Sequence, residues 1–156
     1  MTDPVSEFEH SHDRLTSLAM ELRRSVAASH DAAFKSWDTL VEQVHSLREE
    51  LLLHFAKEEE GLFPFVRSHI PAKIDAVNRM ERAHDTICGT VVRLGYLLKR
   101  PPIDPDATLP QLHSLHERFE RAYADHSREE KELFSELGTS LDSHKRAALI
   151  ELLLGL

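Results

Sequence analysis

The chain has 156 residues, a formal net charge of −8, one cysteine and 11 histidines. Its length predicts a single domain over residues 1–156, and the lone Cys88 excludes an intrachain disulfide framework and cysteine-rich zinc motifs. The acidic balance argues against nucleic-acid binding, and no apolar run is long enough for a membrane span. Because the N-terminus is polar and acidic, with no secretion signal, we expect a cytoplasmic protein.

Apolar residues recur at spacings of three and four in five segments, which is the pattern of amphipathic helices. Prolines mark the expected breaks, and Gly138 is the expected cap of the fourth helix. The breaking prolines are Pro4, Pro71, Pro101, Pro102, Pro105 and Pro110. The expected helices span about residues 6–28, 36–68, 72–99, 108–137 and 140–154. The predicted fold class is all-α, an up-down-up-down antiparallel four-helix bundle with a short C-terminal fifth helix.

Histidines and glutamates interrupt the apolar seam at matching places in the two halves of the chain. Two histidines lie 42 residues apart in each half, and a glutamate follows the second histidine four residues later, on the same helix face. The chain is therefore two copies of H-x41-H-x3-E offset by 72 residues, which indicates a duplicated helical hairpin. The six residues of this double pattern are His12, His54, Glu58, His84, His126 and Glu130.

The six residues are expected to lie at one height in the bundle. Counted from the expected turn near Ile70, His54 lies 16 residues back and His84 lies 14 residues on. At about 1.5 Å of rise per residue, these depths agree to within a few Å. Because unpaired buried ionisable groups are costly, four converging imidazoles and two carboxylates predict a buried metal site. This ligand set favours a borderline transition metal such as iron over magnesium or calcium, and the two-fold pattern favours two ions.

The pattern of His12, His54–Glu58, His84 and His126–Glu130 resembles that of the hemerythrin-like (HHE cation-binding) domain, over nearly the whole chain. The resemblance implies a four-helix bundle with two iron ions in a non-haem di-iron centre. It implies that Glu58 and Glu130 are bridging carboxylates, beside an oxo, hydroxo or water bridge. It also implies a small diatomic or peroxide ligand, and thus a protein that reacts with or senses O₂, peroxide or NO.

The chain departs from the oxygen-carrying hemerythrins at two places. The carriers have a second histidine one turn from the first on the third helix, where this chain offers only Met80 and Cys88. They also have an aspartate where the second repeat here ends in Glu130. These departures favour peroxide, NO or iron chemistry over reversible O₂ carriage.

Two other functions remain open: a di-iron enzyme with catalase-like peroxide turnover, and a metal-free helical interaction module that uses its seam only for packing. Neighbouring side chains also have two interpretations each. Glu9, Asp13, Glu81 and Asp85 are solvated flanks or assist the site, and Tyr123 and Cys88 are core residues or assist it.

Other polar residues are expected to lie away from the site. We expect His10 to be exposed, His116 to be a hydrogen-bonded core histidine, and Glu59 and Glu60 to be solvated charges. No role is expected for His30, His45, His69, His113 and His144.

Overall fold

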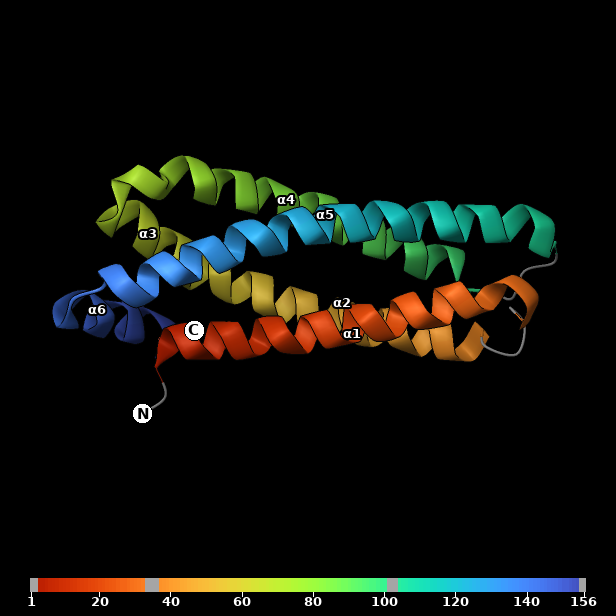
Figure 1. Ribbon diagram of the computed structural model, residues 1–156, viewed down its shortest axis with the longest axis horizontal. Helices are drawn as coiled ribbons and strands as arrows, with labels where there is room; N and C mark the ends of the chain where they lie inside the picture. Colours follow the sequence, from red (N-terminus) through yellow and green to blue (C-terminus); the bar gives the residue numbers. More distant parts are fainter. Residues whose placement is uncertain (1–2, 33–36, 101–103, 155–156) are drawn as a thin grey trace.

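The computed structural model describes residues 3–32, 37–100 and 104–154, and every regular element in these ranges is helical (Figure 1). The predicted all-α class is therefore confirmed. The elements are α1 (Pro4–Ala32), α2 (Trp37–Lys57), η1 (Glu58–Leu62), α3 (Phe63–His69), η2 (Pro71–Lys73), α4 (Ile74–Leu97), α5 (Pro105–Ser140) and α6 (Ser143–Leu154). The element η1 is a π-helical turn and η2 is a 3₁₀ turn. Among the described helices, none combines the length and the apolar character needed to cross a membrane.

The long helices α1, α2, α4 and α5 form a bundle along the long axis of the molecule (Figure 1). The helix α1 packs against α2 and α5, and α4 packs against the same two helices, so α1 lies diagonally opposite α4. The short helix α6 lies at one end of the bundle, where it contacts α1, η1 and α3. Each long helix therefore presents one face to a shared interior.

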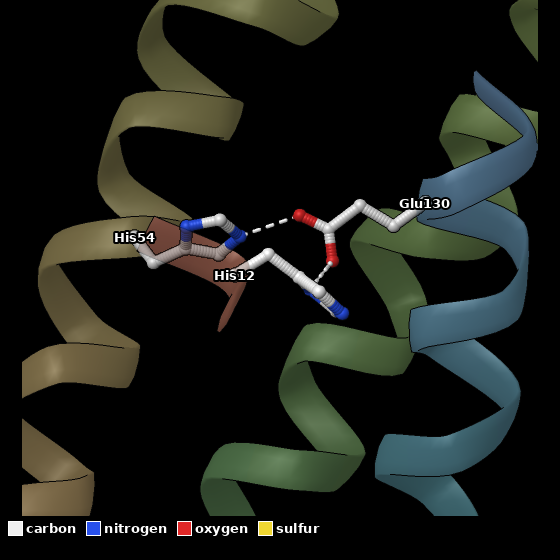
Figure 2. Close-up of side chains that lie close together, drawn as sticks. All are labelled: His12, His54 and Glu130. Carbon is white, nitrogen blue, oxygen red and sulfur yellow. Dashed lines mark hydrogen bonds and ion pairs between the residues drawn. The ribbon is translucent and has the colours of Figure 1, made fainter. Parts of the chain in front are cut away.

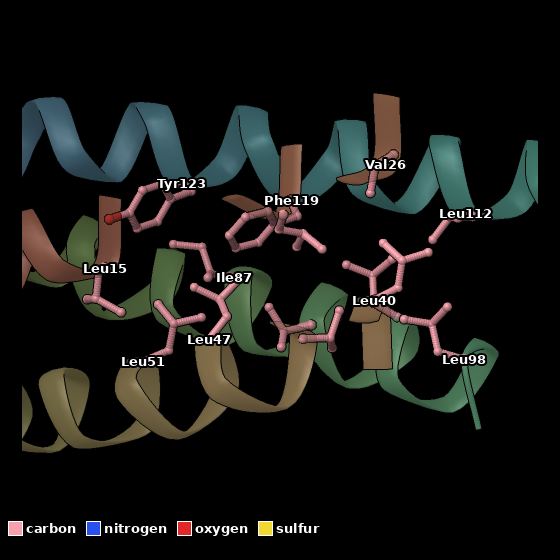
Figure 3. Packing of buried hydrophobic residues seen from close by; sticks show 14 of the residues in the cluster. Leu15, Val26, Leu40, Leu47, Leu51, Ile87, Leu98, Leu112, Phe119 and Tyr123 are labelled. Carbon is pink, nitrogen blue, oxygen red and sulfur yellow. The ribbon is translucent and has the colours of Figure 1, made fainter. Parts of the chain in front are cut away.

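Two hydrophobic clusters fill this interior. The larger cluster draws on α1, α2, α4 and α5, and Figure 3 shows its side chains meeting between these helices. The smaller cluster lies towards α6 and includes side chains of η1 and α3. In sequence, the six residues of the double pattern fall where each helix passes from one cluster to the other, as His84 does between Met80 and Ile87. The apolar core is therefore split by a polar layer.

Helix α5 differs from the prediction at both of its ends, at a proline and at a glycine. The helix α5 already begins at Pro105, so Pro110 lies inside it and not in a connection. The helix also passes through Gly138 without a left-handed backbone and ends at Ser140. Pro110 lies beyond the first turn, so α5 continues past it without the hydrogen bond that a backbone N–H would donate to the carbonyl group of Asp106. Glycine ends a helix only where the turn requires a positive φ, and Gly138 has none.

Other boundary predictions have mixed outcomes. The helix α1 begins at Pro4, in the first-turn position that proline favours, and continues to Ala32, past the predicted end near residue 28. The predictions for residue 36, Pro101 and Pro102 lie outside the described residues.

The predicted helix over 36–68 contains a π-helical turn that sequence patterning does not reveal. The helix α2 ends at Lys57, and Pro64 lies in the first turn of α3 directly after η1. Proline has no backbone N–H, and its ring crowds the carbonyl group four residues earlier, so regular α-helical hydrogen bonding cannot continue through it. Such π-helical turns are frequent at functional sites, and this one begins at Glu58.

The larger cluster should contribute stability independently of the polar layer. Leu47 is fully buried in this cluster, whereas Leu52, on the same helix, is 46% exposed. Leu47→Ala is expected to lower the free energy of unfolding by about 2–5 kcal/mol, because it removes buried methyl groups and leaves a cavity. Leu52→Ala should change it by no more than about 0.5 kcal/mol. Chemical denaturation of both variants measures the difference, and equal losses would contradict this description of the core.

Candidate metal centre

The structure brings all six residues of the double pattern into one buried layer. They come from α1, α2, η1, α4 and α5, and none of the six is more than 3% exposed. Their convergence follows from the inward-facing positions that each occupies on its helix, at the level where the two hydrophobic clusters meet. The layer consists of His12, His54, Glu58, His84, His126 and Glu130.

The layer divides into two groups of three potential metal ligands. The first group is His12, His54 and Glu130, and the second group is Glu58, His84 and His126. Within each group, one ligand atom from each residue lies within 4.8 Å of the other two. Each group thus combines the two histidines of one sequence repeat with the glutamate of the other repeat.

In the first group, Glu130 lies between two imidazoles from different helices (Figure 2). Its Oε1 is 2.5 Å from Nε2 of His54, and its Oε2 is 2.8 Å from Nδ1 of His12. One carboxylate therefore joins α5 to α1 and α2.

In the second group, Glu58 faces the histidines of the other half of the chain. Its Oε2 lies 2.8 Å from Nε2 of His84 and 3.9 Å from Nε2 of His126. The π-helical turn is therefore joined to α4 and α5.

Each carboxylate also reaches into the other group. Oε1 of Glu58 is 3.1 Å from Nε2 of His54, and Oε2 of Glu130 is 3.6 Å from Nε2 of His126. A carboxylate that faces ligands of two neighbouring positions is placed as a bridging carboxylate would be.

Several buried atoms of the layer have no hydrogen-bond partner. They are both carboxylate oxygens of Glu58, Nε2 of His12, Nε2 of His84 and both ring nitrogens of His126. Leaving such an atom unsatisfied costs about 1–3 kcal/mol, so a molecule seldom carries several in one place. Imidazole nitrogens and carboxylate oxygens that approach one another without hydrogen-bond geometry suit coordination of a shared ion. The donor set fits a borderline transition metal.

Burial keeps two of the imidazoles neutral. It lowers the pKa of His84 to about 4 and the pKa of His126 to about 4. Burial acts in the same direction on His54, but contacts with Glu130 and Glu58 outweigh it and raise the pKa of His54 to about 10. At pH 7 the metal-free layer therefore contains a protonated His54 beside two neutral imidazoles that can each donate a lone pair to a metal.

The pKa values of the two carboxyl groups are shifted in opposite directions. Burial and the neighbouring charge of Glu130 raise the pKa of Glu58 well above its usual range. Burial alone would also raise the pKa of Glu130, but its contacts with Glu58, His12 and His54 lower it well below that range. In the metal-free layer, bound protons therefore supply positive charge that metal ions would otherwise supply.

Two contacts from outside the layer orient its imidazoles. Nδ1 of His54 is hydrogen-bonded to Oγ of Ser11 at 2.9 Å, and Nδ1 of His84 is hydrogen-bonded to Oε1 of Glu59 at 2.7 Å. The prediction that Glu59 is only a solvated charge was wrong. Its contact depends on the π-helical turn and that of Ser11 on the pairing of α1 with α2, so sequence patterning revealed neither residue.

Aromatic rings enclose the layer. His84 is stacked on Phe55, at a ring-centroid distance of 3.7 Å, and on Phe63, at 5.4 Å. His12 is stacked on Tyr123 at 6.2 Å. The Tyr123 hydroxyl lies 3.2 Å from Oγ1 of Thr16, and burial raises the pKa of this phenol to about 12. Tyr123 therefore stays protonated beside the first group without belonging to either group.

The other candidate residues lie outside both groups. Glu81 pairs with Arg67 at 2.5 Å, Cys88 is partly buried in the α2–α4 interface, and Met80 is fully buried in the smaller cluster. His116 is buried, but its Nε2 makes no hydrogen bond and lies 3.7 Å from Glu120, contrary to the expectation of a hydrogen-bonded core histidine. The exposed candidates are Glu9, His10, Asp13, Glu60 and Asp85.

The histidines for which no role is expected also lie outside the two groups, in so far as they are described. His45 and His144 are exposed, His69 and His113 are partly buried, and the side chain of His30 lies outside the described part of the chain.

Two cavities adjoin the first group. One, of about 190 Å³, lies between α1 and α5, and its lining includes His12 and Tyr123. The other, of about 270 Å³, lies against α1, α2 and α6, and its lining includes Ser11 and Phe8. Molecules of a few atoms fit in either space and can come close to the layer.

Comparison with known proteins agrees with this geometry. The family model of the Hemerythrin HHE cation binding domain matches residues 3–137. No curated protein and no solved structure matches the chain significantly. The matched range includes all six residues of the layer and covers most of the chain. The chain therefore belongs to the hemerythrin HHE cation-binding domain family.

Proposed function

We propose that this protein is a non-haem di-iron protein that reacts with or senses O₂, peroxide or NO. In this proposal, residues 1–156 form one hemerythrin-like domain, an up-down-up-down antiparallel four-helix bundle with α6 as a short fifth helix. The observation that carries the proposal is the pair of facing groups, each with two imidazoles and one carboxylate, in a layer closed to solvent. Membership of a cation-binding family supports the same function.

The ligands follow from the two groups. His12 and His54 would hold one ion, and His84 and His126 the other, with Glu58 and Glu130 between them. Two irons would supply one-electron redox chemistry and coordination positions that a small molecule can occupy. Three carboxylate and imidazole ligands per position leave room for such a molecule.

The surrounding side chains determine what can reach this layer. Phe55 and Phe63 cover the second group, whereas cavities of about 190 and 270 Å³ adjoin the first group. Bulky substrates are excluded by the burial of the layer, but diatomic molecules and peroxide are small enough to enter. The protonated Tyr123 phenol beside His12 can donate a hydrogen bond without competing as a ligand.

A second candidate function is enzymatic turnover of peroxide by the same centre. Neither Met80 nor Cys88 contributes an imidazole to the second group, so each position has the same number of histidines. A coordination position left open on one ion by the missing imidazole would favour peroxide chemistry over reversible O₂ carriage.

Metal content tests the proposed function directly. His54→Ala and Glu130→Ala should each remove most of the bound metal, because each removes a ligand atom from the first group. His10→Ala and His144→Ala alter exposed histidines and should leave metal content unchanged. Metal analysis after anaerobic iron loading measures all four variants beside the unaltered protein. Equal losses in all four, or a metal-free wild-type protein, would support a helical module without a metal.

Metal binding should release protons at pH 7. His54, with a pKa of about 10, is protonated in the metal-free layer and must lose its proton to become a ligand, whereas His84 and His126, with pKa values of about 4, are already neutral. We expect about one proton from His54 per loaded centre, a release that the raised pKa of Glu58 favours further, and the contribution of His54 to vanish as the pH rises above about 10. Calorimetric titration in buffers of different ionisation enthalpy measures this release. Heats that do not depend on the buffer would contradict this protonation scheme.

Peroxide separates the two candidate functions. Iron-loaded protein that forms a long-lived coloured adduct after one addition of peroxide acts as a binding or sensing protein, whereas steady evolution of O₂ indicates turnover. The proposed function predicts the adduct, and steady O₂ evolution would favour the enzymatic alternative. An absorption spectrum and an oxygen electrode record the two outcomes, and metal-free protein is the control.

A further inference from the structure

Two consecutive glutamates contact the two nitrogens of one imidazole. Oε2 of Glu58 lies 2.8 Å from Nε2 of His84, and Oε1 of Glu59 lies 2.7 Å from Nδ1 of the same ring. The Glu58 side chain is completely buried, whereas that of Glu59 is 40% exposed. The imidazole is therefore held at one edge from inside the layer and at the other edge from the surface.

The π-helical turn explains how neighbours in sequence reach one ring. Successive side chains of an α-helix point about 100° apart, so one of two neighbours normally faces away from a shared target. A π-helical turn closes its hydrogen bonds over five residues, so its successive side chains diverge less. Because η1 begins at Glu58 and includes Glu59, both carboxylates can face α4.

Among the described residues, no carboxylate from outside the layer contacts an imidazole of the first group. Its His54 is hydrogen-bonded through Nδ1 to the neutral hydroxyl of Ser11. The 72-residue repeat that relates Glu58 to Glu130 relates Glu59 to Lys131, and Lys131 lines the same cavity as His12. The symmetry of the six inner residues is therefore broken around them, because the repeat-related positions 59 and 131 hold an anion and a cation.

We infer that Glu59 is a positioning residue that makes the two metal positions unequal, so that the second group binds its ion more tightly than the first. This inference rests on the proposed metal-binding function. A carboxylate behind a ligating imidazole fixes the ring and its tautomer and raises its basicity, and removing such a partner typically weakens metal binding by about 10–100-fold. A serine hydroxyl fixes the ring but adds no charge.

Three variants separate the effect of orienting the His84 ring from the effect of the Glu59 charge. Glu59→Ala removes both the hydrogen-bond acceptor and the charge, whereas Glu59→Gln retains an acceptor oxygen and removes only the charge. Glu60→Gln is the matched control, because Glu60 lies in the same π-helical turn and is exposed. Circular dichroism of the metal-free proteins checks that each variant remains folded.

The experiment is a calorimetric titration of metal-free protein with Zn²⁺, together with a Co²⁺ titration followed by its absorption spectrum. Wild-type protein is expected to bind two ions in two resolved steps. Glu59→Ala should weaken the tighter step by about 10–100-fold. Glu59→Gln should weaken that step less and shift the Co²⁺ spectrum of the first equivalent, a change that a purely structural role would not produce. Glu60→Gln should match the wild type.

The possible failures are distinguishable. A wild-type protein that binds neither ion would overturn the proposed function and the inference together. Two ions bound with equal affinity, or a Glu59→Gln variant that matches the wild type in both titrations, would overturn only the inference. An equal effect of Glu59→Gln and Glu60→Gln would also overturn it, because surface charge alone would then account for the change.

Discussion

The contact on which the rest of the structure depends is the one between each buried glutamate and the histidines of the opposite repeat. Glu130 joins α5 to α1 and α2, and Glu58 joins η1 to α4 and α5. A slip of one helical turn would move a carboxylate by about 5.4 Å and leave it buried without its partners. Because an unpaired buried charge is far more costly than a lost apolar contact, the polar layer restricts the helices to one register.

The hydrophobic clusters on either side make this layer chemically useful. Apolar side chains exclude water, so charges in the layer interact more strongly than they would at the surface. The same exclusion leaves ring nitrogens and carboxylate oxygens without partners, as in His126 and Glu58. Protons can compensate for this only in part, as the raised pKa values of His54 and Glu58 show. Divalent ions satisfy more of these atoms at once, which is why the layer suits metal.

The helices and the six inner residues could be predicted because both leave a periodic trace in the sequence. An inward-facing histidine occupies a position of the apolar seam, and duplication repeats it at a fixed offset. The exchange of glutamates between repeats could not be predicted, because spacing fixes height in the bundle but not which neighbour a side chain faces. Helix ends were less predictable still, because the sequence around Pro110 and Gly138 does not indicate whether the helix ends there or continues.

The residues that sequence patterning missed lie around the layer, and this location has a physical reason. An inner residue such as Glu58 cannot change without leaving buried partners unsatisfied, so the inner set keeps the symmetry of the repeat. Glu59 and its counterpart Lys131 are partly or fully exposed and can differ in charge at little cost to folding. Glu59 nonetheless contacts the His84 imidazole directly, and such a contact would act on a bound metal through that ring. The six inner residues alone would make the two proposed metal positions equivalent. The outer residues can therefore make these positions unequal.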